Sequence, residues 1–271
     1  MSTFVAQDPG PPEKPRAASV LLPVTPADAL IELVLTAVLL FVVVTAVWWV
    51  FDGPAARGAA GIHVRLTAVG LIVAVTLWAL ILSPWGRRSG AHANPAVTLA
   101  LWLMGSFPAA AVPGYRAAQL AGSLLGTGGA RLLLGADIAA QPVDYGLARP
   151  APGWAWWQIF LAEAGTVFVI LMILGFLLSR SDQRARQLLP YVLPAAVAVV
   201  IIWLGPLSGG SGNPARQFGP ALFAGADGTL AAYLAGPMLG ALAAAGAHRL
   251  LLRRRPKTHR LCGTDTPATL P

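Results

Sequence analysis

Charged residues are scarce in this chain. Only 11% of its 271 residues are Asp, Glu, Lys or Arg, whereas 56% are hydrophobic, and an average soluble domain has roughly 25% charged residues. The mean hydropathy is +0.66. The shortage of charge excludes an ordinary soluble domain and indicates a protein that lies in a membrane.

Cysteine is nearly absent as well. The single Cys262 lies in a polar tail, which excludes a disulfide framework within the chain and a cysteine metal site. The apolar segments contain no pairing of nucleophile and base, no metal-ligand cluster and no phosphate-binding loop. We therefore expect no catalytic residue, metal or cofactor, and an enzyme is the least supported class.

The 19 Lys and Arg exceed the 11 Asp and Glu and give a net charge of +8. The basic residues stand between apolar segments instead of forming one stripe, so we expect no nucleic-acid partner. They are explained by topology in a membrane.

Six apolar segments are long enough to cross a bilayer core, which takes about 20 residues. They lie at about 28–51, 63–83, 113–135, 156–179, 190–207 and 229–252. The predicted fold is an all-α membrane protein. We expect a disordered N-terminal tail over 1–27, a first half over 28–135, a connecting loop over 136–153, a second half over 154–252 and a basic, disordered tail over 253–271.

Six spans put both ends of the chain on one side of the membrane. The tails and the loops after the second and fourth spans carry most of the basic residues, namely Lys14, Arg16, Arg87, Arg88, Arg180, Arg184, Arg186, Arg253, Arg254, Arg255, Lys257 and Arg260. The opposite loops offer chiefly Arg57 and Arg149. By the positive-inside rule both termini are expected in the cytoplasm, with the protein in the plasma membrane and in contact with its lipid.

One tripeptide occurs twice, as Asn94, Pro95 and Ala96 and as Asn213, Pro214 and Ala215. Each copy precedes an apolar run too short to cross a bilayer. Pro suits the first turn of a helix and Asn is a strong N-cap, so each copy predicts the start of a half-helix. Non-helical backbone at membrane depth is tolerated only in protein or beside a watery cavity, so two re-entrant loops predict a pore.

An internal repeat accompanies the tripeptide. Tyr115 and Tyr233 are 118 residues apart, the two tripeptides are 119 apart, and Glu32 and Glu163 each stand near the start of a span. Because each half has three spans, the second half enters the membrane from the opposite face. The two half-helix N-termini should then meet near the bilayer centre, where their partial positive charges repel cations.

The two motifs, in the contexts SGAHANPAV and NPARQFGPA, make the chain resemble the aquaporin, or major intrinsic protein, family over residues 28–252. The resemblance implies a homotetramer with one pore in each subunit. It also implies passive transport of water or small neutral solutes, exclusion of protons and ions, and an aromatic and arginine constriction outside the central motifs.

The resemblance assigns four residues to that constriction, which are Arg216, Gly210, Ile201 and, counted 20 residues before Asn94, Ala74. The count to Ala74 crosses the stretch SPWGRR, which leaves room for a shift. Strict water channels of the family usually have His where Ile201 stands and an aromatic residue where Ala74 stands. We therefore expect a wide, apolar filter that passes glycerol, urea or undissociated metalloid acids, although Gln217 replaces the Asp usual in glycerol facilitators.

Plainer readings stand beside these. The two Asn residues could be ordinary caps, and Arg216 could form a structural ion pair, although a charge within the membrane is by default functional. Glu32 and Glu163 could relay protons, but the family favours carboxyls that support the re-entrant loops. His92 is favoured as a satisfied loop residue over a pH gate.

Three other functions remain open. A water-only aquaporin would pass water and no solute. A secondary transporter also uses inverted repeats and broken helices, but it needs ion-coupling groups that this chain almost lacks, and its flux would saturate or follow a proton gradient. A purely structural role would leave Arg216 unexplained.

Overall fold

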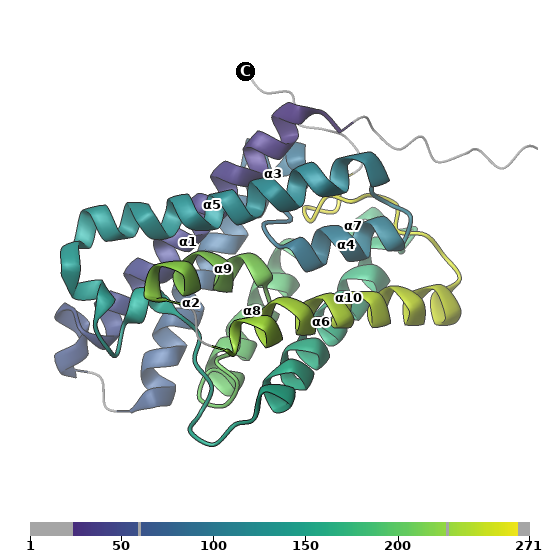
Figure 1. The fold of residues 1–271 in the computed structure, drawn as a ribbon. Helices are drawn as coiled ribbons and strands as arrows, with labels where there is room; N and C mark the ends of the chain where they lie inside the picture. Colours follow the sequence, from purple (N-terminus) through teal and green to yellow (C-terminus); the bar gives the residue numbers. More distant parts are fainter. Residues whose placement is uncertain (1–23, 59–60, 226–227, 265–271) are drawn as a thin grey trace, which may run out of the picture.

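The computed structural model describes residues 24–58, 61–225 and 228–264, and over these residues it contains helices and no strand (Figure 1). The six long helices are α1 Pro26–Phe51, α2 Ile62–Leu82, α5 Val112–Leu134, α6 Trp156–Leu178, α8 Leu189–Leu204 and α10 Leu230–Leu252. The shorter ones are α3 Pro84–Ser89, α4 Pro95–Leu103, α7 Gln183–Arg186 and α9 Pro214–Ala224, with 3-10 turns η1 Pro54–Gly58, η2 Ala109–Ala111, η3 Gly135–Ala139 and η4 Asp144–Gly146.

The long helices coincide with the six predicted spans, and α4 and α9 are the two predicted half-helices. Among the described residues, five helices are long and apolar enough to cross a membrane when α7 and α8 are counted together, and α5 is the long helix left out. Gln119, Ser123 and Thr127 reduce the hydropathy of α5, but all three are buried within the protein. The predicted all-α membrane fold is confirmed.

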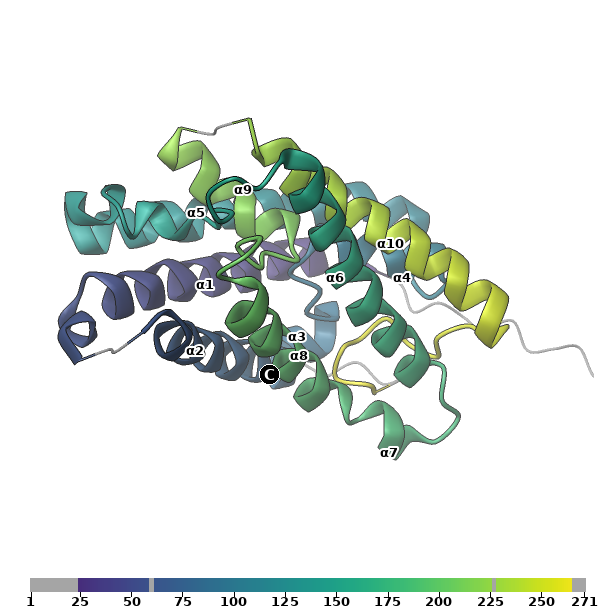
Figure 2. The ribbon, with the colours of Figure 1, turned by 90° about the horizontal axis from the view of Figure 1, so that it is seen from below.

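Each half is held together by glycines that bring two long helices into contact. Helix α5 packs on α1, and α10 packs on α6 (Figures 1 and 2). A Cβ atom at Gly122 would lie 2.4 Å from the Leu33 carbonyl oxygen, and one at Gly240 would lie 2.3 Å from that of Ala164. Small residues of this kind allow helix backbones to approach closely in a membrane.

The two halves interlock through their half-helices. Helix α4 of the first half packs on α10 of the second, while α9 of the second half packs on α5 of the first. Helices α2 and α8 form a further contact between the halves. Because each half-helix lies against the last span of the other half, both re-entrant loops are brought to the middle of the bundle.

The outside of the long helices is apolar. A surface that faces lipid needs to be apolar, because the bilayer core has no water to bond to exposed polar groups. Large exposed hydrophobic side chains occur on all six long helices, among them Leu30, Leu71, Val75, Leu125, Leu161, Val199, Leu239 and Leu250. The half-helices belong to the buried core, and their Ala96, Ala100, Leu101 and Ala215 are fully covered.

The connecting loop and part of the C-terminal tail are more buried than the sequence predicted. The connecting loop 136–153 is partly buried, with Ile138 and Val143 packed against Val44 of α1. The expected disorder of the C-terminal tail is wrong for residues 258–263, which are buried, because this segment folds back onto the bundle. The disorder expected for residues 1–23 and 265–271 falls outside the described part of the chain.

Candidate pore

The two Asn side chains cap the half-helices and cross-link the re-entrant loops. Asn94 Oδ1 accepts a hydrogen bond from the Ala96 amide at 2.9 Å, and Asn213 Oδ1 accepts one from the Ala215 amide at 2.9 Å. Asn94 Nδ2 donates to the Gly212 carbonyl at 3.0 Å. An amide nitrogen has two hydrogens, so each Asn keeps a second donor after one is used in this way.

The loops before the two caps have the same backbone shape. Ala91 and Ala93 have φ angles of 54° and 43°, and Gly210 and Gly212, 119 residues further along, have φ angles of 58° and 57°. This left-handed region suits glycine and costs other residues roughly 1–2 kcal/mol each. The non-helical backbone leaves the Ala93 and Gly212 carbonyls outside a helical ladder, and they accept the side-chain hydrogen bonds of Asn213 and Asn94.

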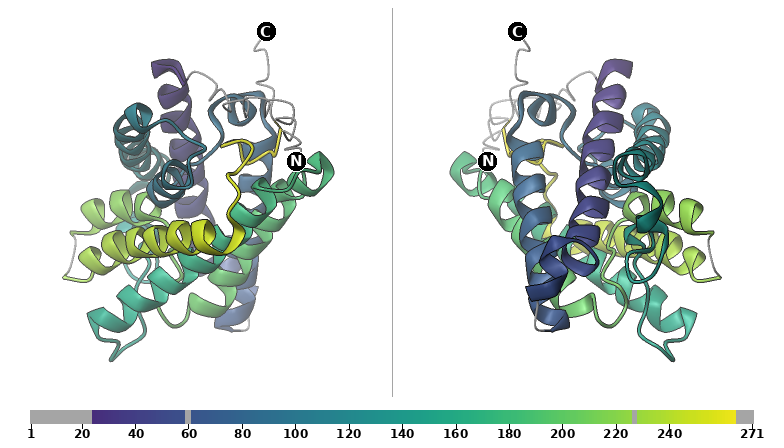
Figure 3. Two further views of the ribbon diagram at one scale, coloured as in Figure 1. Left: turned by 90° about the vertical axis from the view of Figure 1, so that its right-hand side faces the viewer. Right: turned by 90° about the vertical axis from the view of Figure 1, so that its left-hand side faces the viewer.

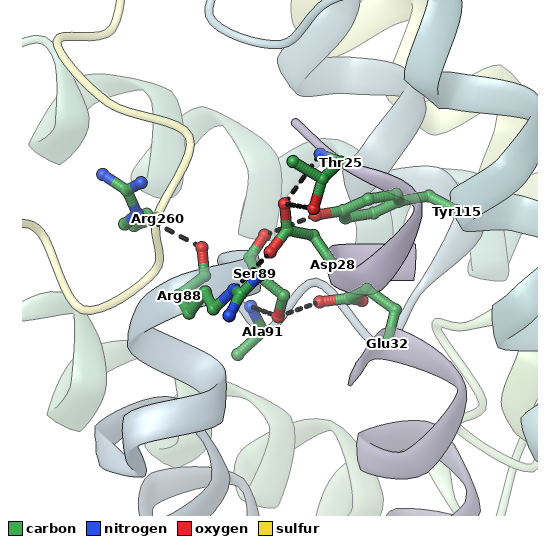
Figure 4. Close-up of polar contacts among 8 residues, drawn as sticks. All are labelled: Thr25, Asp28, Glu32, Arg88, Ser89, Ala91, Tyr115 and Arg260. Carbon is green, nitrogen blue, oxygen red and sulfur yellow. Dashed lines mark hydrogen bonds and ion pairs between the residues drawn. The ribbon is translucent and has the colours of Figure 1, made fainter. Parts of the chain in front are cut away.

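Glu32 anchors the first loop. Its Oε1 accepts from Ser89 Oγ at 2.7 Å (Figure 4). Oε1 also accepts from the His92 amide at 3.0 Å, and Oε2 accepts from the Ala93 amide at 2.7 Å. Gln119 Nε2 of α5 donates to Oε2 at 2.9 Å, which is the fourth hydrogen bond to this carboxylate. A fully buried carboxylate with four donors is a stable anchor, because charge-assisted hydrogen bonds offset its desolvation.

Glu163 makes the equivalent contacts in the second half. Its Oε1 accepts from Ser208 Oγ at 3.2 Å and from the Ser211 amide at 3.1 Å, and its Oε2 accepts from the Gly212 amide at 2.6 Å. Thus each carboxylate faces the backbone of a re-entrant loop and neither is among the residues that line the cavity described below.

Two tyrosines complete this support, and the sequence analysis gave them no role. Tyr115 Oη donates to the Ser89 carbonyl at 2.8 Å, and Tyr233 Oη donates to the Ser208 carbonyl. Ser89 and Ser208 are 119 residues apart, like the tripeptides. The repeat offset was the signal that could have identified the Ser and Tyr pairs.

A cavity of about 280 Å³ runs past both Asn side chains. One wall is aliphatic and comes from four long helices, with Leu39 and Val43 of α1, Val69 and Val73 of α2, Val167 and Leu171 of α6, and Val197 and Ile201 of α8. The other wall consists of residues 91–94 and 209–213 of the re-entrant loops, followed by Arg216. The lumen is therefore amphipathic, apolar on one side and hydrogen-bonding on the other.

Three of the four expected constriction residues meet in this cavity. Ile201, Gly210 and Arg216 all line it. Arg216 Nη1 donates to Gln217 Oε1 at 3.1 Å, and in the described part of the chain it is not a member of a salt bridge. The structural ion pair considered for Arg216 is thus not formed with a described residue.

Ala74 is not among the residues that line the cavity, whereas Val69 is. A Cβ atom on Gly70 would lie 3.2 Å from the Ala198 carbonyl oxygen of α8, and the neighbouring Val69 packs in one cluster with Ile201. The stretch SPWGRR contributes to an additional helix, α3, between α2 and the loop. The count of 20 residues from Asn94 passes through α3 and ends at Ala74, whereas the α2 residues that line the cavity and share a cluster with Ile201 are Val69, Val73 and Leu77.

The end of the cavity beside Arg216 is organised by the connecting loop. Gln217 Nε2 donates to the Ala148 carbonyl at 2.8 Å, and Gln217 Oε1 accepts from the Ala148 amide at 3.2 Å. Arg149 forms a salt bridge with Asp144, and both line the cavity. Gln217 thus joins the connecting loop to Arg216, a role that the sequence analysis did not foresee.

His92 is a fully bonded loop residue. Its Nδ1 lies 3.1 Å from Thr98 Oγ1, and its Nε2 lies 3.1 Å from the carbonyl oxygen of His259 in the C-terminal tail. Because a carbonyl can only accept, Nε2 is the donor in the second bond. The first loop is therefore linked to the tail through His92.

The charges of the lumen wall bear on what can enter the cavity. No cluster of three His, Cys, Asp or Glu side chains that could hold a metal occurs among the described residues. The N-termini of α4 and α9 both start at the Asn residues that line the lumen, and helix N-termini carry partial positive charge. A neutral molecule with hydroxyl or amide groups fits this lumen better than a cation.

Comparisons with known proteins agree with this geometry. The family model described as Major intrinsic protein matches residues 25–248. Aquaporin AqpM of Methanothermobacter marburgensis is 38% identical over 193 residues, which cover 68% of this chain and 74% of that protein. Aquaporin NIP1-3 of Oryza sativa subsp. japonica is 39% identical over 185 residues, which cover 67% of this chain and 59% of that protein.

The fold is also that of a solved structure. The X-ray structure of the aquaglyceroporin from Plasmodium falciparum matches with a TM-score of 0.67 and 20% sequence identity, covering 84% of this chain and 97% of that one. With two capped half-helices meeting at a cavity inside an inverted repeat, and with these matches over most of its length, the chain belongs to the major intrinsic protein family and is a membrane channel, not an enzyme.

Proposed function

We propose that the chain is a passive channel for water and small uncharged solutes of the size of glycerol, urea or undissociated metalloid acids. The observation that carries this proposal is the amphipathic lumen, in which aliphatic side chains face the Asn amides and the loop backbone. A polyol or an amide can bond to the polar wall while its carbon skeleton contacts the aliphatic wall.

The filter of this proposal consists of Val69, Ile201, Gly210 and Arg216, with Val69 in place of Ala74. These supply one guanidinium donor, two aliphatic side chains and no second polar side chain. A filter without an imidazole or an aromatic ring offers more width than a water-only filter, which favours solute passage over the water-only alternative. The central residues Asn94 and Asn213 orient the solute, with Pro95, Ala96, Pro214 and Ala215 forming the first helical turns around them.

Exclusion of protons and ions follows from the fixed charges of the lumen. Two helix N-termini and Arg216 place positive potential along it, and cations are repelled by such a field. Glu32 and Glu163 are held in loop hydrogen bonds away from the lumen, which argues against coupling groups of a secondary transporter.

The assembly and orientation are part of the same proposal. The family supports a homotetramer in which every subunit has its own lumen. We place the protein in the plasma membrane, with the α3 and α7 end of the bundle in the cytoplasm. The positive-inside rule supports this orientation, because the basic residues at this end are Arg87 and Arg88 of α3, Arg184 and Arg186 of α7, and Arg253 after α10.

Reconstitution in liposomes tests the function. Stopped-flow light scattering should give water permeability above that of empty vesicles, together with a glycerol or urea flux that increases linearly with the concentration gradient. Water flux without solute flux would establish the water-only alternative. Solute flux that saturates or follows an imposed proton gradient would establish a transporter.

A further inference from the structure

The chain after α10 turns back across one end of the bundle. Arg253, Arg254 and Arg255 are exposed, but every residue from Thr258 to Gly263 is buried. In Figure 2 this yellow stretch passes between α6 and α3, and in the left view of Figure 3 it rises from the end of α10 towards the blue helices. We call residues 257–263 the tail segment.

Three backbone contacts attach the tail segment to separate elements around this end of the pore. The Lys257 amide donates to the Leu178 carbonyl, the last residue of α6, at 2.8 Å. The Leu261 amide donates to the Gly90 carbonyl, just after α3, at 3.1 Å. Arg186 Nε of α7 donates to the Gly263 carbonyl at 3.3 Å. The anchors belong to both halves of the repeat, so the tail segment bridges the opening between them.

Side chains of the tail segment pack on the first re-entrant loop. The His259 carbonyl accepts from His92 Nε2 at 3.1 Å, and the His259 ring lies 5.2 Å from that of Phe107 at 65°. Arg260 Nε donates to the Arg88 carbonyl at 3.4 Å (Figure 4). Contacts of this kind tie the segment to the loop that carries Asn94.

Leu261 of the tail segment contacts the lumen itself. It lines the same cavity as Asn94 and Arg216, and only 2% of it is exposed. Leu261 and Cys262 also belong to one buried cluster with Leu178 and Leu193. An apolar side chain from the tail therefore forms part of the wall of the cavity that contains the Asn pair.

We propose that the tail segment is a plug that closes the α3 and α7 end of the pore, with Leu261 as its inserted side chain, and that the pore conducts when the segment is released. This inference rests on the proposed channel function. Closure and release form a two-state equilibrium, and the hydrogen bonds to Leu178, Gly90 and His92 are made only in the closed state.

Flux measurements on three chains in liposomes test the plug. One chain ends at Arg255 and lacks the tail segment, one ends at Thr264 and keeps it as a matched control, and one is full length. If the plug is closed about nine-tenths of the time, its removal raises water and glycerol permeability by about tenfold. The chain ending at Thr264 should conduct like the full chain.

The native Cys262 gives a second readout that does not depend on conduction. It is the only cysteine, and 3% of it is exposed, so a maleimide should label it slowly in the folded full-length protein and rapidly after denaturation. The full-length variant Leu261→Asp should label rapidly while folded and should conduct like the chain that ends at Arg255.

The outcomes separate the plug from the channel. Equal permeability of all chains, above that of empty vesicles, overturns the plug and leaves the channel standing, as does rapid labelling of Cys262 in the folded native chain. Permeability no higher than that of empty vesicles for every chain, the one ending at Arg255 included, overturns the channel function and the plug with it.

Discussion

Asn94 and Asn213 each donate a hydrogen bond to the loop that precedes the other. Asn94 Nδ2 bonds to the Gly212 carbonyl at 3.0 Å, and Asn213 Nδ2 bonds to the Ala93 carbonyl at 2.9 Å. The two half-helices are therefore fixed to one another by the same side chains that cap them. The remaining amide hydrogens form a rigid pair of donors in the lumen, at the point where both helix N-termini are directed.

The residue of α2 that sets the width of the filter can be identified by substitution. Val69→Phe should lower glycerol and urea permeability by about tenfold or more, because an aromatic ring beside Ile201 occupies the space that a solute needs. Stopped-flow measurements in liposomes give both water and solute permeability. Water flux should fall less, since water is smaller.

Ala74→Phe is the matched control for this prediction. Ala74 does not line the cavity, so the same ring at this position should leave solute permeability within about twofold of the native value if the variant folds. A loss of solute flux in Ala74→Phe with normal flux in Val69→Phe would contradict our choice of Val69.

Removal of the charge of Arg216 should weaken ion exclusion. Arg216→Ala should give measurable proton or cation conductance in planar bilayers, because this guanidinium is on the lumen wall and forms no salt bridge with a described residue, whereas Arg149 is paired with Asp144. Arg216→Lys keeps the charge and should conduct ions much less. Equal ion leakage in the two variants would show that width, and not charge, is the barrier.

The features that could be predicted from the sequence depend on residues that lie near one another along the chain. Runs of apolar residues gave the six long helices, and Asn followed by Pro gave the starts of α4 and α9, because caps and span lengths depend on neighbouring residues. Ile201, Gly210 and Arg216 were assigned to the filter by short counts from Asn213; all three line the cavity, and their role as a filter stays a prediction. The support of the loops by Glu32 and Glu163 was expected from the family resemblance, and both carboxylates accept hydrogen bonds from these loops.

The unpredictable part depended on contacts between distant segments. Val69 was missed because the stretch SPWGRR contributes to α3 and changes the count. Leu261 was missed because a short apolar pair in a basic tail has no periodicity, and its burial depends on α3, α6 and α7. Gln217 was noted as a departure from glycerol facilitators, but its bonds to Ala148 involve a residue 69 positions away.

The carboxylates beneath the loops should matter for stability more than for flux selectivity. Glu32→Gln turns one of the two carboxylate oxygens into an NH2 donor, which then faces either the His92 amide or the Ala93 amide, and a buried amide left without a partner costs about 1–3 kcal/mol. Thermal unfolding in detergent should show a clear fall in Tm. The exposed Asp52 supplies the charge-matched control, since Asp52→Asn should leave the Tm nearly unchanged. An unchanged Tm in Glu32→Gln would contradict the supporting role.

Gly210 should tolerate no side chain. Its φ is 58°, and a Cβ atom there would lie 2.9 Å from the Val200 carbonyl oxygen. Gly210→Ala should therefore reduce the free energy of unfolding by roughly 1–2 kcal/mol through left-handed strain, and further through the clash with the backbone. Gly225 has a φ of 73° and no atom within 4 Å of its Cβ position, so Gly225→Ala reports the strain alone. Equal losses of stability in the two variants would mean that the backbone shifts at Gly210 and avoids the clash, which would contradict this prediction.

The closure by the tail segment should depend on pH through His259. Burial, together with the neighbouring His92 and Arg260, lowers the pKa of His259 well below its ordinary value in the closed state. Glu32 contacts the backbone of His92, and Arg88 contacts Arg260. In the released state the pKa returns to about 6.5, so the released state binds more protons below this pH.

The sign of the effect follows from this difference. The closed state has its full stability above about pH 6.5 and loses up to about 1.4 kcal/mol for each pH unit below it, until the lowered pKa is passed. Between about pH 6.5 and 5.5 the ratio of closed to released chains should therefore fall by up to about tenfold, and the permeability of a full chain that starts about nine-tenths closed should rise by up to about fivefold. The chain that ends at Arg255 has lost His259 and should show no such rise. His259→Asn in the full chain should also remove it, and a rise that persists in both variants would assign the pH dependence to another group.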